Sequence, residues 1–243
     1  FLKKMKADII GVSLNTTTNP SHFKLLNLKS KNKFLDITDF KKLKTIIESN
    51  KPDFIFHLAA QALVKKSYNN PHHTWSSNLI GTLNLLEVLR NYKNRTNVII
   101  ITSDKVYKNI EQEAGYKEED KLGGSDPYSA SKVCSEIISY CFKDSFFKKK
   151  GHLISTARAG NVIGGGDWSD HRLIPDIVRS WKNKKILNVR NPNSIRPWQH
   201  VLDPTFGYMY LVYKMNLNKK YSGNYNFGPN VNNNIRVINI IHY

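Results

Sequence analysis

Short apolar runs alternate with amphipathic segments along the first two-thirds of the chain. Residues 7–14, 53–60, 97–102 and 152–158 are typical of buried strands, and residues 34–37 form a shorter run that contains an acid. Residues 39–49 and 71–92 carry apolar side chains at helical spacing, and Thr38 is suited to cap the first of these helices. Strands that alternate with helices predict an α/β fold with a Rossmann-like, doubly wound parallel sheet.

Segments after residue 166 are shorter and rich in Asn, Pro and Trp. We expect residues 1–166 to form the sheet domain and residues 167–243 a smaller, incomplete substrate lobe over the carboxyl edge of the sheet. A dinucleotide-binding sheet begins with a strand and a glycine-rich turn, whereas residues 1–6 already resemble the end of the helix that follows. The sequence therefore predicts a chain truncated at both ends, without the first strand and its Gly-rich loop.

Polar, ionisable residues follow one of the buried runs directly. Ser103, Asp104 and Lys105 come immediately after residues 97–102. A buried parallel strand that stops at such residues delivers them to the carboxyl edge of the sheet, where open α/β folds bind ligands. The triplet is therefore a candidate for chemistry.

A tyrosine and a lysine share one face of the predicted helix that follows. Tyr128 and Lys132 stand four residues apart, after Asp126 as a suitable N-cap and Pro127 at the first helical position. The ammonium is expected to stabilise the phenolate and to lower the pKa of Tyr128 from ~10, which would make it a usable base. This spacing also arises by chance in many helices, and only the strand-end triplet and the capped helix make it informative.

Composition excludes several classes of protein. Apolar residues make up 40% of the 243, and no apolar run approaches the ~20 residues that span a bilayer, so we expect a cytoplasmic protein without a membrane partner. The net charge is +18, but only eight of the 37 basic residues are Arg and the Lys are scattered, which argues against nucleic-acid binding. Cys134 and Cys141 lack neighbours at metal-ligand spacing, so we expect reduced thiols and no metal.

Motifs along nearly the whole chain carry a family resemblance. They are GVSL at 11–14, FHLAAQ at 56–61, TSDKVY at 102–107, DPYSASK at 126–132, ARAGNVIGGGDW at 157–168, RLIPD at 172–176, IRPWQHV at 195–201 and NFGP at 226–229. Together they resemble the extended short-chain dehydrogenase/reductases, and within that family the CDP-glucose 4,6-dehydratases. DPYSASK marks only the superfamily, whereas TSDK with GNVIGGGDW and IRPWQH is more specific.

The resemblance implies a reaction and roles for five residues. Such enzymes oxidise the sugar at C4 with NAD, eliminate water across C5–C6 and return the hydride to C6. Tyr128 would take the C4 hydroxyl proton, Lys132 would lower its pKa and contact the nicotinamide ribose, and Ser103 would hydrogen-bond the C4 oxygen. Asp104 would be the acid of the elimination if burial raises its pKa. Lys105 stands where related dTDP-glucose dehydratases carry Glu, so it would act as a neutral amine or through water, which requires a desolvated side chain.

The resemblance also implies binding residues and partners. For NAD, the matching positions are Ser13, Asp36, Ile37, Ala59, Ala60 and Asn78, with Tyr128 and Lys132; Ser13 stands where an acid often binds the ribose, so NAD and NADP are not distinguished. For the CDP-glucose substrate they are Asn161, Arg172, Arg196 and Gln199. A homodimer is implied for the full-length protein.

Two other functions are compatible with the sequence. A nucleotide-sugar 4-epimerase needs only the Ser103, Tyr128 and Lys132 set and has no use for an acid–base pair at 104 and 105. An inactive nucleotide-sugar-binding remnant would account for the missing phosphate loop.

Overall fold

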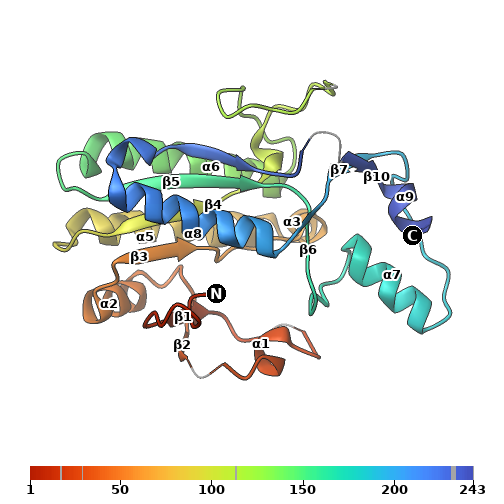
Figure 1. Ribbon diagram of the computed structural model, residues 1–243, viewed down its shortest axis with the longest axis horizontal. Helices are drawn as coiled ribbons and strands as arrows, with labels where there is room; N and C mark the ends of the chain where they lie inside the picture. Colours follow the sequence, from red (N-terminus) through yellow and green to blue (C-terminus); the bar gives the residue numbers. More distant parts are fainter. Residues whose placement is uncertain (17, 29, 113, 231–233, 243) are drawn as a thin grey trace.

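A four-stranded parallel sheet forms the centre of the molecule. The computed structural model describes residues 1–16, 18–28, 30–112, 114–230 and 234–242. Strands β3 (Phe54–His57), β4 (Asn97–Ile101), β5 (Leu153–Ala159) and β9 (Asn224–Phe227) lie in the order β3-β4-β5-β9, all parallel (Figure 1). The predicted α/β fold with a parallel sheet is confirmed.

Helices cover both faces of this sheet. Val98 and Ile100 of β4 pack into a core with α5 (Gly81–Asn91) and α6 (Pro127–Phe142), whereas Ile99 between them packs with α8 (Leu202–Leu217). Alternate strand residues point to opposite faces, and β4 is apolar on both, as expected of a strand buried on two sides. The result is three layers with the carboxyl ends of β3, β4 and β5 at one edge.

The first two strands pair with each other and differ in extent from the predicted ones. Strand β1 (Ile10–Ser13) pairs in parallel with β2 (Lys31–Phe34), and the short helix α1 (His22–Leu25) connects them. The strand predicted at 34–37 was placed too late, because the Asp36 carboxylate and carbonyl accept hydrogen bonds from the backbone N–H groups of residues 38 and 39 and turn the chain.

A long helical segment follows β3 as predicted. After α3 (Val64–Asn69), helix α4 (Pro71–Trp75) continues through a π turn, Ser76–Ile80, into α5.

Helix α2 (Phe40–Asn50) precedes β3, and its cap was predicted wrongly. Asp39 Oδ1, not Thr38, accepts a hydrogen bond from the Lys42 N–H at 3.1 Å. The positive end of the helix dipole also stabilises a carboxylate at this position.

Helix α6 begins as its sequence predicts. Asp126 Oδ1 accepts hydrogen bonds from the N–H groups of Tyr128 and Ser129 at 2.9 and 3.0 Å, and Ser129 Oγ accepts one from the Asp126 N–H at 3.1 Å. This reciprocal capping box fixes the first turn, with Pro127 at its start. A second π turn, Lys143–Phe147, ends the helix.

The segment after residue 166 does not form one separate lobe. Helix α7 (Leu173–Lys182), the antiparallel pair β7 (Ile195–Pro197) and β10 (Asn234–Arg236), and α9 (Val237–His242) extend beyond one end of the sheet (Figure 1). Strand β8 (Gln199–His200) pairs with β6 (Val162–Ile163). Helix α8 and strand β9 instead belong to the sheet layers, a correction to the boundary expected at 166, because their apolar residues pack on β4 and β5.

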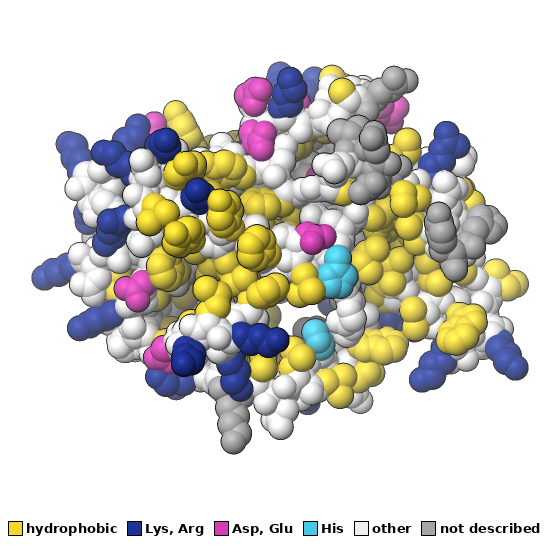
Figure 2. Space-filling model, viewed as in Figure 1, with side chains coloured by type: hydrophobic (Ala, Val, Ile, Leu, Met, Phe, Trp, Pro, Cys, Tyr) yellow, Lys and Arg dark blue, Asp and Glu magenta, His cyan; other side chains and the backbone are white. Residues whose placement is uncertain are grey.

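The surface combines dispersed charge with one apolar helix face. Figure 2 shows Lys and Arg spread around the edge of this side of the molecule, while apolar side chains gather over α8. The exposed apolar residues of that helix are Leu202, Phe206, Tyr210, Tyr213 and Leu217. Over the part of the chain that the structure describes, none of the helices is both long enough and apolar enough to cross a membrane.

Candidate active site

A cavity of about 610 Å³ lies at the carboxyl edge of the sheet, where β4, β5 and the start of α6 meet the segment 187–198. Nine of the predicted site residues line it: Ala60, Ser103, Asp104, Lys105, Tyr128, Lys132, Asn161, Arg172 and Arg196. The six others lie outside its lining: Ser13, Asp36, Ile37, Ala59, Asn78 and Gln199. The five predicted catalytic residues are therefore together in one cavity.

The triplet after β4 forms a tight turn. Residues Asp104–Val106 make a single 3₁₀ turn, and Ser103 Oγ accepts the Lys105 N–H at 3.2 Å while donating to Asp104 Oδ1 at 3.1 Å. Burial raises the pKa of the Asp104 carboxyl, and the Ser103 hydroxyl and the charges of Lys105 and Arg196 oppose this only in part. A raised pKa suits a carboxyl group that donates a proton.

The side chain of Lys105 does not meet its predicted condition. It lines the cavity but is exposed, so the structure does not provide the desolvation that a neutral amine was expected to need. The expectation was wrong because the turn directs residues 103 and 106 inward, where both are buried, and residue 105 outward.

Tyr128 and Lys132 lie on one face of α6, but their coupling differs from the prediction. The Lys132 ammonium is buried and donates to the Ile101 carbonyl at 2.9 Å. Burial lowers the pKa of Lys132 to about 8, although the Glu136 carboxylate acts in the opposite direction. Burial raises the pKa of Tyr128, and the Ser103 hydroxyl and the Arg172 charge offset this only in part. The lowering expected from Lys132 alone is thus not found, because its ammonium is bound to the end of β4.

Asn78 is buried, as predicted, and its side-chain amide connects two segments of the protein. Its Oδ1 accepts the Gln61 N–H at 2.8 Å, and its Nδ2 donates to the Gln61 carbonyl at 3.1 Å and to Ser131 Oγ at 2.9 Å. Ser131 Oγ in turn donates to the Tyr128 carbonyl at 2.7 Å. Asn78 therefore holds the turn after β3 against the helix that carries Tyr128 and Lys132.

The remaining residues expected to hold NAD follow neighbouring strands. Ser13 ends β1, Asp36 and Ile37 follow β2, and Ala59 and Ala60 follow β3. Ile37 packs so closely on α5 that a Cβ placed on Gly81 would lie 2.3 Å from Ile37 Cδ1. Small residues after β3 and a buried ammonium beside the cavity fit a dinucleotide that runs along the strand ends.

The predicted substrate residues divide into two groups. Arg172 Nη1 lies 3.7 Å from Asp167 Oδ2, and Arg196 donates to its neighbouring carbonyl, so both guanidinium groups stay at the cavity wall and keep N–H donors for an anion. Gln199 is buried instead, and its Nε2 donates to the Phe227 carbonyl at 2.8 Å. It joins β8 to the end of β9 and, since it is outside the cavity lining, positions the wall.

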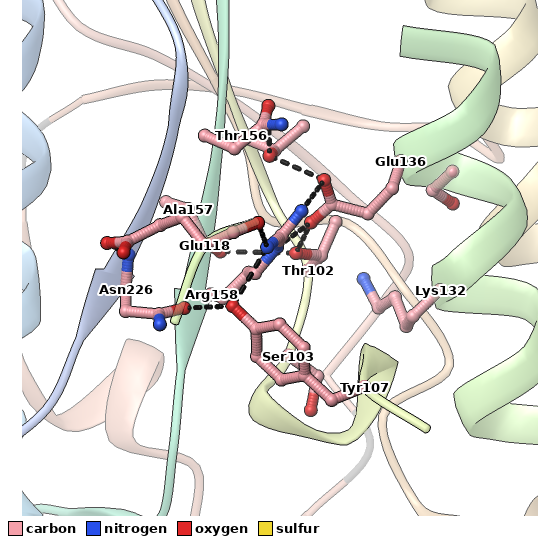
Figure 3. A network of polar contacts seen from close by, with 12 residues as sticks. Thr102, Ser103, Tyr107, Glu118, Lys132, Glu136, Thr156, Ala157, Arg158 and Asn226 are labelled. Carbon is pink, nitrogen blue, oxygen red and sulfur yellow. Dashed lines mark hydrogen bonds and ion pairs between the residues drawn. The ribbon is translucent and has the colours of Figure 1, made fainter. Parts of the chain in front are cut away.

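Several residues near the site were not among the predicted site residues, although Asp167 and Trp198 lie within the family motifs at 157–168 and 195–201. Arg190, Asp167, Trp198 and Tyr208 line the cavity from loops and from α8. Behind it, Glu136 and Arg158 form a buried ion pair with Nε and Oε1 2.9 Å apart (Figure 3). The spacing of Glu136, four residues after Lys132 on the same helix face, was the signal that could have identified it.

Comparisons with known proteins identify the family of the chain. The model of the family described as GDP-mannose 4,6 dehydratase matches residues 3–240. The chain is 45% identical over 237 residues to a CDP-glucose 4,6-dehydratase of Salmonella typhimurium, covering 94% of this chain and 66% of that protein. It is 30% identical to a UDP-glucuronate 4-epimerase of Thermodesulfobacterium geofontis, covering 84% of this chain and 63% of the relative. The chain thus spans somewhat less than two thirds of the length of these relatives.

Solved structures share the fold. A dTDP-glucose 4,6-dehydratase from Bacillus anthracis in complex with NAD superposes with a TM-score of 0.79 at 20% identity, over 99% of this chain and 72% of the other. A UDP-glucose 4-epimerase from Thermus thermophilus, also with NAD, gives a TM-score of 0.82 at 20% identity, over 99% and 75%. The chain therefore belongs to the GDP-mannose 4,6-dehydratase family, whose relatives matched here are nucleotide-sugar 4,6-dehydratases and 4-epimerases.

Proposed function

We propose that the protein containing this chain is an NAD-dependent CDP-glucose 4,6-dehydratase, which converts CDP-glucose into CDP-4-keto-6-deoxyglucose and water. The observation that carries this proposal is the presence of Asp104, with its raised pKa, beside Ser103 and Tyr128 in one cavity. Elimination of water needs a proton donor for the leaving hydroxyl, whereas epimerisation at C4 does not. The 45% identity to a CDP-glucose 4,6-dehydratase supports CDP-glucose as the substrate.

The residues that fit NAD are Lys132 and Ala60 at the cavity and Ser13, Asp36, Ile37 and Ala59 after the neighbouring strands. Asn78 braces the helix that carries Lys132. When bound, NAD supplies the acceptor for the C4 hydride and its later return to C6.

The chain's own side chains then move protons. Tyr128 accepts the proton of the C4 hydroxyl in its phenolate form, which the Ser103 hydroxyl and the Arg172 charge favour against the effect of burial. The Ser103 hydroxyl also donates a hydrogen bond to the C4 oxygen. Once C4 is a ketone, the C5–H bond is acidic, and Asp104 gives its proton to the C6 hydroxyl as water leaves. The C5 proton passes to a water molecule that Lys105, exposed at the cavity wall, orients, and from that water to solvent.

Two guanidinium groups select the substrate by charge. Arg172 and Arg196 line the cavity on the side away from the sheet and are the candidates to bind the diphosphate of the nucleotide sugar. Asn161, which follows β5 and also lines the cavity, is a candidate to bind the sugar hydroxyls. The homodimer and the cytoplasmic location that the resemblance implies belong to the same proposal.

The test is incubation of the natural protein with NAD and, separately, CDP-glucose, dTDP-glucose, UDP-glucose and GDP-mannose. Product formation is followed by NMR at the C6 position, where dehydration converts a hydroxymethyl group into a methyl group. A 4-keto-6-deoxy product from CDP-glucose alone supports the proposal. A C4 epimer without a methyl signal would identify an epimerase, and binding without turnover an inactive nucleotide-sugar-binding protein.

A further inference from the structure

A buried carboxylate behind the cavity is fully hydrogen-bonded. Glu136 on α6 is 4% exposed and accepts four hydrogen bonds, from Thr102 Oγ1 at 2.5 Å, Thr156 Oγ1 at 2.6 Å, and Arg158 Nε and Nη2 at 2.9 and 3.0 Å (Figure 3). Both charged side chains are almost completely buried. Two-point pairing of this kind fixes orientation as well as distance.

The arginine extends the network to the other side of the triplet. Arg158 Nη1 donates to the Tyr107 hydroxyl at 2.8 Å and to the Glu118 carbonyl at 2.9 Å. The Tyr107 hydroxyl donates onward to Asn226 Oδ1 at 2.6 Å, on β9. Burial by itself lowers the pKa of Arg158, but the hydrogen bonds and charge of Glu136 outweigh it and raise that pKa above its ordinary value, so the guanidinium group stays charged.

The two anchored residues bracket the triplet. Thr102 immediately precedes Ser103, and Tyr107 follows the turn Asp104–Val106. Thr102 donates to Glu136 and Tyr107 accepts from Arg158, so both residues bind the same ion pair (Figure 3). The position of the whole turn therefore depends on Glu136 and Arg158, which do not line the cavity themselves.

The same carboxylate is the charged neighbour of Lys132. The two residues are four apart on α6, and the Glu136 charge raises the pKa of Lys132 against the effect of burial. The other ionisable groups near this lysine are Tyr128 on α6, Asp104 in the turn after β4 and His57 on β3, whose pKa burial and the Lys132 charge lower to about 3. Among these, His57 is neutral at physiological pH, so it adds no repulsion to the Lys132 ammonium.

We propose that Glu136 and Arg158 are positioning residues: their buried ion pair holds the turn 103–106 in register with α6 and fixes a carboxylate one helical turn from Lys132. The part of this inference that concerns catalysis rests on the proposed dehydratase function. The part that concerns the turn and Lys132 does not.

Three variants separate charge from geometry. Glu136→Gln removes the charge and nearly preserves the shape, Glu136→Asp keeps the charge but shortens the reach, and Thr156→Val removes one donor and is the matched control. The double variant Glu136→Gln, Arg158→Met leaves no unpaired buried charge, which protects the experiment if the first variant does not fold.

Two readouts are independent of activity. The Lys132 ammonium is titrated by NMR of labelled lysine, and the amide exchange of residues 103–107 is measured by mass spectrometry. We expect the Lys132 midpoint to fall by about one pH unit or more in Glu136→Gln, and to stay near that of the parent in Glu136→Asp and Thr156→Val. Exchange at 103–107 should rise at least about tenfold in Glu136→Gln and Glu136→Asp, as expected when hydrogen bonds to a charged group are lost.

The catalytic part is measured on CDP-glucose. Glu136→Gln should lower kcat at least tenfold with KM changed less than threefold. It should also shift the pH profile of kcat to lower pH, whereas Glu136→Asp should leave the profile at the same pH. An unchanged Lys132 midpoint together with unchanged exchange in Glu136→Gln and in the double variant would overturn the inference. If no nucleotide sugar is dehydrated, the proposed function fails, and these two readouts still decide the inference.

Discussion

Replacing Lys132 with methionine isolates the free-energy cost of keeping an ammonium group buried beside the cavity. Burial lowers the pKa of this lysine from 10.5 to about 8, and its single described hydrogen bond runs to the Ile101 carbonyl at 2.9 Å. Methionine has a similar length and no charge, so the variant removes the titration and retains most of the packing.

The sign of the effect follows from proton counting. Between pH 8 and pH 10.5 the unfolded chain holds more protons on Lys132 than the folded chain, so this residue makes the free energy of unfolding rise as the pH rises. At ~1.36 kcal/mol per pKa unit, the full rise is about 3 kcal/mol. The variant lacks this rise. The free energy of unfolding of the parent minus that of Lys132→Met should therefore become more positive by that amount across the window.

Urea unfolding at intervals from pH 7.5 to pH 10.5 measures this difference. Titration of other groups affects both proteins equally and cancels. Lys93→Met, at an exposed lysine, is the matched control and should give a difference that is nearly constant with pH. A parent-minus-Lys132→Met difference that changes by less than ~0.5 kcal/mol over the window would refute the burial argument.

Three further predictions concern the site and its support. Tyr128→Phe removes the base and little volume, so kcat should fall by ~10²–10⁴ while calorimetry shows nearly unchanged nucleotide-sugar binding; activity within twofold of the parent would exclude this role. Asp104→Asn combined with Lys105→Ala should block elimination after C4 oxidation, so stopped-flow absorbance at 340 nm should show reduced nicotinamide accumulating; no accumulation in a folded variant would assign these residues to the first step. Gly124→Ala should destabilise the fold by ~1–3 kcal/mol in urea unfolding, because its Cβ would lie 2.2 Å from a backbone nitrogen of α6, whereas Gly115→Ala, with open space around it, should not.

Sequence patterns predicted the elements whose formation is governed locally. The apolar run before Ser103 and the Asp126–Pro127 start of α6 were identified because strand burial and helix capping depend on residues a few positions apart. Those two elements bring the five predicted catalytic residues to one cavity, which is why residues far apart in the sequence could be expected to meet there.

Features that depend on distant segments were not predictable in the same way. Strand β9 joins the sheet through β5, about seventy residues earlier, and the direction of the Lys132 side chain depends on the carbonyl that ends β4. Lys105 is exposed because of the orientation of its turn, and that orientation depends on the contacts of Thr102 with Glu136 and of Tyr107 with Arg158. Each of these depends on which groups meet after the chain has folded.

The π turn at Ser76–Ile80 makes the length of this helical segment adjustable. A π turn holds one residue more than an α turn, so the extra residue is absorbed locally and the helices on either side keep their buried faces. The Asn78 carbonyl, released from the regular pattern, accepts the hydroxyl groups of Thr82 and Ser135 at 2.6 and 2.9 Å. Deletion of one residue here would convert the segment into a regular α-helix and remove these two hydrogen bonds. Removal of one residue within α5 would instead rotate its apolar face by ~100° away from the sheet. Insertions and deletions among homologues should therefore collect in this turn.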